Sequence, residues 1–295
     1  MNESWEATVK RIAMYALALW MAILTVYAQP EQVFVPDLRQ AFPFLGERVV
    51  EPPDDVHLDA LDAAAYGIPA SGEVPQPAYL LMEGAPTQTP VYLIDSGKPG
   101  PVVYVLAGTH GDERAGWYAA TMLKGMRISA GKLYVLPQAN KPGSEAARRT
   151  VQGSLDLNRA YPGHPQGDAA MQLAHAIVRD IEKAQPVVVL DLHEAAVFAR
   201  GRDFLGNKVI YTTLDGIEDL FFALLTAFEE GALGAVPFGF VSPGVADSLN
   251  AVLPEVAGIP VLTVETFRGY PLSRRVQDQV DIVLACLRFY GMMEE

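Results

Sequence analysis

The sequence predicts an α/β fold built on a mostly parallel sheet. From about residue 90 onward, short apolar runs alternate with segments whose composition or spacing is helical. Such runs are typical of buried strands, and the run Val102–Ala107 ends at Gly108. Strands that alternate with helices favour a parallel sheet covered by helices. Half of the 295 residues are hydrophobic, which is enough to form the core of such a domain.

The first part of this pattern contains three strands and one helix. Pro90–Ile94 and Val102–Ala107 are apolar runs separated by a turn of glycine and proline. Arg114–Met126 has the composition of a helix, and Lys132–Pro137 is the third apolar run. The pattern therefore predicts the order strand, strand, helix, strand.

The second part continues the alternation to the end of the chain. Asp168–Lys183 carries apolar residues at the spacing of an amphipathic helix. Further strands are expected at Val187–Leu192, Val209–Thr212 and Pro260–Glu265, and further helices at Asp215–Glu230, Asp247–Val256 and Arg274–Tyr290. In an open sheet of this kind, functional sites form at the carboxyl ends of the strands.

The residues before this pattern suggest export. Lys10 and Arg11 precede the apolar run Ile12–Ala28, which ends in small residues as a signal peptide does. Residues 1–28 are therefore expected to be a signal peptide or a membrane anchor, and residues 12–28 would form the tether if they are retained. We expect an exported (periplasmic or extracellular) or membrane-anchored protein. Residues 29–87 form a proline-rich lead-in, and residues 88–295 form the main domain.

Charge and cysteine content restrict the ligands. The formal net charge is −13, which disfavours a polyanion and therefore nucleic acid, but leaves a small anionic substrate open. Cys286 is the single cysteine, so an intramolecular disulfide and a multi-cysteine metal site are excluded. Any metal ion must bind to histidines and carboxylates. The oligomeric state is not predicted.

Two histidine motifs follow predicted strands. His110 and Glu113 come just after the second predicted strand, and His193 comes just after the fourth. Imidazole and carboxylate are good Zn²⁺ ligands, and a catalytic zinc site uses three protein ligands and a water molecule. Asp191 lies on the same strand face as His193 and is placed to accept a hydrogen bond from its imidazole. Each motif alone also fits a structural histidine.

A loop rich in arginine lies between these two motifs. It contains Asn158 and Arg159 and follows Arg148 and Arg149. Arginine binds a carboxylate with two parallel hydrogen bonds, so arginines near a metal ion suit a carboxylate-bearing substrate. An ordinary surface turn is the alternative interpretation.

Glu265 comes at the end of the last predicted strand. A carboxylate beside a metal-bound water can take its proton and later donate that proton to a leaving nitrogen. A structural ion pair between Glu265 and Arg268 is the alternative interpretation of this position.

Together, these segments resemble the zinc carboxypeptidase superfamily, and more narrowly its succinylglutamate desuccinylase/aspartoacylase branch. The similarity covers about residues 88–290 and is carried by Gly108–Gly116, Asp156–Gly163, Asp191–His193 and Val264–Glu265. The resemblance implies a three-layer α/β/α sandwich with a mixed, mostly parallel sheet. It makes residues 88–295 a zinc hydrolase catalytic domain.

The resemblance also assigns roles to the site residues. It implies that one Zn²⁺ per chain is bound by His110, Glu113 and His193, and that Glu265 acts as general base and then as general acid. Asn158 and Arg159 would hold a substrate carboxylate. An upstream arginine would stabilise the oxyanion, and Arg149 is preferred over Arg148 for this role.

The implied activity is that of a zinc-dependent hydrolase (deacylase). It would cleave an amide or ester bond of a small, carboxylate-bearing N-acyl amino acid-like substrate with a metal-activated water. Thirty residues follow Glu265, so we expect no C-terminal β-domain of the aspartoacylase type. Two alternatives remain open: an exported metallo-carboxypeptidase acting on peptides or peptidoglycan stems, and a zinc-free ligand-binding module on the same fold.

Overall fold

In this computed structural model, the described part of the chain is residues 66–294, except residues 67, 74, 152, 197–205, 213–215, 234–237 and 243. The predicted signal peptide or membrane anchor at residues 1–28 lies outside these described residues. Within them, no helix combines the length and the apolar character that crossing a membrane requires.

An eight-stranded sheet forms the centre of the described residues, with strand order β1-β2-β4-β3-β5-β8-β6-β7. The strands are β1 (Tyr79–Leu81), β2 (Thr89–Asp95), β3 (Val102–Ala107), β4 (Lys132–Leu136), β5 (Val188–Ala195), β6 (Lys208–Tyr211), β7 (Gly239–Val241) and β8 (Val261–Phe267). The four central strands β4, β3, β5 and β8 are parallel, and so are β6 and β7. The other three pairings are antiparallel. The predicted mixed, mostly parallel sheet is confirmed.

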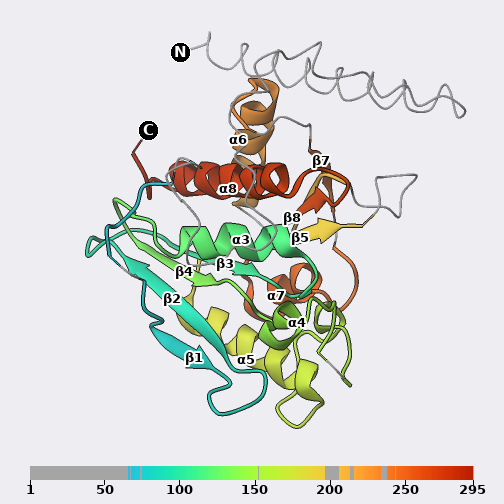
Figure 1. The fold of residues 1–295 in the computed structure, drawn as a ribbon. Coiled ribbons are helices and arrows are strands. Elements are labelled where there is room, and N and C mark those ends of the chain that lie inside the picture. Colours follow the sequence, from blue (N-terminus) through green and yellow to red (C-terminus); the bar gives the residue numbers. More distant parts are fainter. Residues whose placement is uncertain are drawn as a thin grey trace, which may run out of the picture. The chain divides into compact units, whose positions relative to one another are not determined.

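Helices cover both faces of this sheet (Figure 1). One face carries α3 (Arg114–Leu123), α6 (Ile217–Glu229) and α8 (Leu272–Phe289), and the other carries α5 (Ala169–Ala184) and α7 (Leu249–Ala257). Strand β3 serves both cores, because Val103 and Val105 pack on the first side and Tyr104 and Leu106 on the second. This is the predicted three-layer α/β/α sandwich.

Helix α5 shows how closely the local sequence determines an element. The Asp168 side chain accepts a hydrogen bond from the Met171 amide and so caps the first turn. Leu173, Ile177 and Ile181 are fully buried on one side of the helix. Burial of each such side chain contributes about 1.5–3 kcal/mol. The predicted helix Asp168–Lys183 therefore matches the observed one to within a residue at each end.

The structure departs from the sequence analysis at three strands, of which β7 was not expected at all. Strand β5 was expected to end at Leu192 but continues to Ala195, because β3 and β8 flank it and His193 pairs in register with Glu265 of β8. Strand β1 lies in the expected lead-in, yet it pairs with β2 and belongs to the sheet. Short α4 (Lys141–Glu145) and the 3-10 helix η4 (Leu157–Arg159) were not expected either.

Candidate active site

The turn after β3 brings the first two candidate ligands to the sheet edge. His110 lies in this turn, and Glu113 immediately precedes α3. The turn packs against α4 so closely that a Cβ on Gly111 would lie 2.0 Å from the carbonyl carbon of Gly143. The Gly111 amide also donates to the Arg149 carbonyl oxygen over 3.4 Å. Only glycine fits this contact between the two segments.

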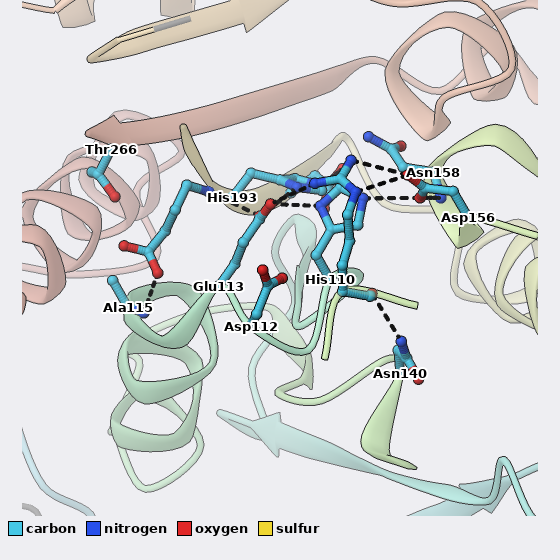
Figure 2. A network of polar contacts seen from close by, with 12 residues as sticks. His110, Asp112, Glu113, Ala115, Asn140, Asp156, Asn158, His193 and Thr266 are labelled. Atoms are coloured by element: carbon cyan, nitrogen blue, oxygen red, sulfur yellow. Dashed lines mark hydrogen bonds and ion pairs between the residues drawn. The ribbon is translucent and has the colours of Figure 1, made fainter. Parts of the chain in front are cut away.

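Glu113 lies between the two candidate histidines (Figure 2). Its Oε1 is 2.6 Å from His110 Nδ1, and its Oε2 is 2.9 Å from His193 Nδ1. All three residues are buried, and one ligand atom from each lies within 4.8 Å of the others. The structure therefore brings together the three residues that the sequence predicted as metal ligands, in an arrangement that can hold a metal ion.

Each imidazole is held from its other side by a further carboxylate. His110 Nε2 is 2.9 Å from Asp156 Oδ1, and His193 Nε2 is 3.1 Å from Asp191 Oδ2. A proton on Nε2 that is donated to a carboxylate leaves the Nδ1 lone pair free for a metal ion. Both Nδ1 atoms face Glu113, so the two rings are oriented for ligation. The role expected of Asp191 matches this contact.

Glu113 reaches the histidines because another acid caps helix α3. The Glu113 side chain makes no capping hydrogen bond. Instead, the Ala115 amide in the first turn donates to Glu194 Oε2 of β5 over 3.0 Å. Glu194 also pairs with Arg275 of α8, and its own amide donates to Glu113 Oε2 over 2.9 Å. This network fixes the Glu113 carboxylate through the Glu194 amide.

The charges of this cluster support one another. Burial opposes protonation of His193, but the Asp191 and Glu113 carboxylates outweigh it and raise its pKa well above the ordinary value. The pKa of His110 is raised too, since Glu113 and Asp156 outweigh its burial. Burial alone would raise the pKa of Glu113, but the two histidines hold it well below its usual range. Without a metal ion, the protonated imidazoles therefore supply the positive charge that balances the carboxylates.

Metal binding should therefore release protons and strengthen as the pH rises. A ligating imidazole must be neutral, and the raised pKa values of His110 and His193 favour their protonated forms in the metal-free protein. Glu113 stays ionised throughout, because its pKa is lowered. We expect zinc affinity to increase from about pH 6 to about pH 8. Calorimetry in two buffers of different ionisation enthalpy measures the released protons, and an affinity that falls over this range would contradict the assignment.

A cavity of about 220 Å³ opens beside His110 and Glu113. Four other predicted site residues line it: Arg149, Asn158, Arg159 and Glu265. The cavity and the adjacent histidine cluster thus bring together residues from four separate motifs. Arg148 and Arg149 are both exposed, but Arg148 is not among the described lining residues. The preference for Arg149 over Arg148 agrees with this placement.

Arg149 is tied to the cluster by two carboxylates. Its Nε donates to Asp156 Oδ2 over 3.0 Å, and its Nη1 lies 3.4 Å from Glu113 Oε1. The adjacent Arg148 amide instead donates to the Gly143 carbonyl oxygen of α4. The two neighbouring arginines therefore make different contacts, which the composition of the segment does not reveal.

Glu265 is buried in β8 and does not form the ion pair that was the alternative for it. Arg268 instead contacts Asp112 Oδ2 over 3.0 Å and approaches Glu113 Oε1 at 3.6 Å. Burial raises the pKa of Glu265 to about 8 in the absence of a metal ion. A carboxyl group with such a pKa can both accept and donate a proton near neutral pH.

Sequence reasoning missed several of these supporting residues. Asp156 begins the motif Asp156–Gly163, in which the sequence indicates no role for it. Glu194 follows His193 directly. Arg275 lies on the last predicted helix, 81 residues from its partner Glu194. The only signal was their place next to motif residues or on a helix that covers the site.

Residues 99–233 match the sequence profile of the succinylglutamate desuccinylase/aspartoacylase catalytic domain. Somewhat less than half of this chain is therefore similar to the catalytic domain of that family. The family is one of deacylating hydrolases. Seven predicted site residues lie within the match, whereas Glu265 lies beyond its end.

One relative agrees with this similarity. The N-alpha-acetyl-L-2,4-diaminobutyric acid deacetylase of Halomonas elongata is 36% identical over 110 residues, which are 35% of this chain and 31% of the relative. The chain thus spans about a third of that protein's length in the match.

Solved structures share the fold. A succinylglutamate desuccinylase from Silicibacter sp. TM1040 has a TM-score of 0.56 at 22% identity, over 70% of this chain and 62% of its own. The tripeptide-bound cell shape determinant protein of Helicobacter pylori has a TM-score of 0.58 at 20% identity, over 69% and 56% of the two chains. At these identities the similarity concerns the fold alone. It agrees with the α/β/α architecture of the described residues.

Proposed function

We propose that this protein is a zinc-dependent deacylase that cleaves the amide bond of a small, carboxylate-bearing N-acyl amino acid. The observation that carries the proposal is the convergence of His110, Glu113 and His193 next to a cavity that Glu265 also lines. Two Nδ1 atoms and a carboxylate are a suitable donor set for Zn²⁺. A simple binding pocket needs neither this set nor a buried acid beside it.

A bound Zn²⁺ would polarise the substrate carbonyl and lower the pKa of a water molecule. Glu265 takes a proton from that water as its oxygen attacks the carbonyl carbon. The carbon–nitrogen bond then breaks, and Glu265 passes the proton to the departing amine. The chain's own carboxylate thus carries the proton from the attacking water to the leaving group.

The arginines supply charge at two other points. The Arg149 guanidinium, held by Asp156 and Glu113, is placed to stabilise the negative charge that develops on the carbonyl oxygen. Asn158 and Arg159 line the same cavity and are the residues we assign to the substrate carboxylate. The Halomonas elongata relative is a deacetylase of an N-acetylated amino acid, which supports this substrate class.

The direct test is a hydrolysis screen with the zinc-loaded protein and a metal-depleted control. We expect N-acyl amino acids to be hydrolysed and peptides with a free C-terminus to be cleaved far more slowly. Preferential release of C-terminal amino acids from peptides would favour the metallo-carboxypeptidase instead. Purified protein that binds no zinc at all would favour a ligand-binding module.

The two neighbouring arginines provide a matched pair of variants. Arg149→Ala should lower kcat about 100- to 1,000-fold, because it removes a group that stabilises the developing oxyanion. Arg148→Ala, which removes the same charge from an exposed position, should change kcat/KM by less than about threefold. Steady-state kinetics with one N-acyl amino acid separates the two. Equal losses in both variants would contradict the assignment.

A further inference from the structure

Two residues of α8 contact the carboxyl end of β5, where His193 lies. Arg275 pairs with Glu194, and this contact belongs to the network around Glu113. Gln279 is four residues further along α8, on the same side of the helix. Its Nε2 donates to the His193 carbonyl oxygen over 2.8 Å. The proton transfers proposed above give Gln279 no part.

The same nitrogen also reaches β8. Gln279 Nε2 lies 2.9 Å from Thr266 Oγ1, and Thr266 follows Glu265 directly. A side-chain amide has two N–H groups, so one nitrogen can donate to both oxygens. The His193 carbonyl oxygen can only accept, so the amide nitrogen must face the strands. Gln279 therefore joins the strand of a candidate metal ligand to the strand of the proposed base.

This bridge lies where β5 has lost one of its neighbours. His193 pairs in register with Glu265 of β8, whereas the pairing of β5 with β3 ends at Leu192. Beyond Leu192, β5 is paired on one side only. The two contacts of Gln279 therefore add to the pairing of β5 with β8 at the point where β3 no longer contributes.

The contacts lie on the opposite face of the sheet from the cavity. Thr266 shares its face with Val264, which packs into the same core as α8. Glu265 points to the other face and lines the cavity. Gln279 is fully buried and is not among the described lining residues. It can therefore act on the site only through the positions of His193 and Glu265.

Packing alone does not explain a glutamine at this position. Gln279 is fully buried, and the neighbouring Val276 and Val280 of α8 belong to the apolar core. Its Oε1 has no hydrogen-bond partner within the described part of the chain. A buried acceptor without a partner is unfavourable. The two contacts of Nε2 are therefore what distinguishes this side chain from an apolar one of the same size.

From these contacts we infer that Gln279 is a positioning residue for the proposed deacylase. It fixes the backbone of His193 relative to the backbone of Glu265, and thereby the separation between a metal ligand and the carboxylate that carries the proton. A misplacement of about 1 Å can lower a rate about 100-fold. The inference rests on the proposed function and extends it to a residue outside the cavity.

Gln279→Met tests the bridge, because it removes both hydrogen bonds and nearly keeps the size of the side chain. Zinc affinity should fall about 10- to 100-fold, since the ligand His193 loses a supporting partner. With zinc at saturation, kcat should also fall about 10- to 100-fold. KM should change by less than about threefold, because the residues assigned to the substrate are unchanged. Chelator competition and steady-state kinetics with one N-acyl amino acid measure these quantities.

Thr266 variants separate the two halves of the bridge. Thr266→Val removes only the contact on β8, so kcat should fall about tenfold while zinc affinity stays unchanged. Thr266→Ser keeps the hydroxyl group and should keep both quantities. Adding Thr266→Val to Gln279→Met should cause no further loss of kcat, because both changes break the same contact.

Tyr104→Phe is the control for a merely structural effect. It removes the hydrogen bond from Tyr104 Oη to Asp180 Oδ2, which joins β3 to α5 over 2.8 Å. This variant should unfold at a lower temperature with unchanged kcat and zinc affinity. The inference is overturned by a folded Gln279→Met that keeps both quantities, by equal kcat in Thr266→Val and Thr266→Ser, or by equal losses in Tyr104→Phe.

Zinc affinity separates this inference from the proposed reaction. If the unchanged protein binds zinc but hydrolyses no N-acyl amino acid, the proposed function fails, and weaker zinc binding in Gln279→Met still supports the role of Gln279. If hydrolysis occurs and Gln279→Met changes neither kcat nor zinc affinity, only the inference about Gln279 fails.

Discussion

Glu265→Gln should lower kcat about 10²- to 10⁴-fold while zinc binding is retained. The amide keeps the size of the side chain but can neither take the proton from water nor return it to the leaving nitrogen. Glu265 does not belong to the group of residues whose ligand atoms converge, so the metal should stay at one per chain. Steady-state kinetics and metal analysis of the same preparation measure kcat and the metal content per chain.

Glu255→Gln is the matched control for this variant. Glu255 is an exposed carboxylate on α7, and its replacement makes the same change of charge away from the cavity. Its kcat should equal that of the unchanged protein. Full activity in Glu265→Gln would remove the proposed proton carrier, and the mechanism would need a different base.

His193→Ala should abolish activity through loss of the metal ion. His193 is 1% exposed and supplies one of the three converging ligand atoms. Losing only an outer partner of a ligand weakens metal binding by about 10- to 100-fold, so losing the ligand itself should weaken it by more than about 100-fold. Competition with a chromogenic chelator measures the affinity.

Two further variants provide an intermediate and an unchanged zinc affinity for comparison. Asp191→Asn keeps His193 but changes the group that holds its Nε2, and should give the intermediate loss. His164→Ala removes an exposed histidine from a loop outside the cluster and should change neither affinity nor activity. Undiminished zinc affinity in folded His193→Ala would show that the ion binds elsewhere.

Elements with a strong hydrophobic pattern could be predicted closely from the sequence. The limits of β3 were predicted to the residue, because a wholly apolar run ends at Gly108. Strands β1 and β7 have three residues each and no such pattern, so they are defined only by pairing with their neighbours. The end of β5 was missed for the same reason, since polar His193 and Glu194 remain in the strand by pairing with β8.

The site shows the same division between local and long-range information. The three candidate metal ligands could be predicted because each follows an apolar run and lies in a motif. The Arg275 contact to Glu194 and the Arg268 contact to Asp112 join residues 81 and 156 positions apart. Nothing in the spacing of either segment indicates such a partner.

The contact between Gly111 and Gly143 limits how this region can diversify. Any side chain at position 111 would force apart the backbone that carries His110 and the backbone that leads to Arg149. In a saturation library, activity should therefore survive at position 111 with glycine alone. Replacements there would need compensating changes around positions 141–149, so in natural or laboratory evolution these two stretches must vary together.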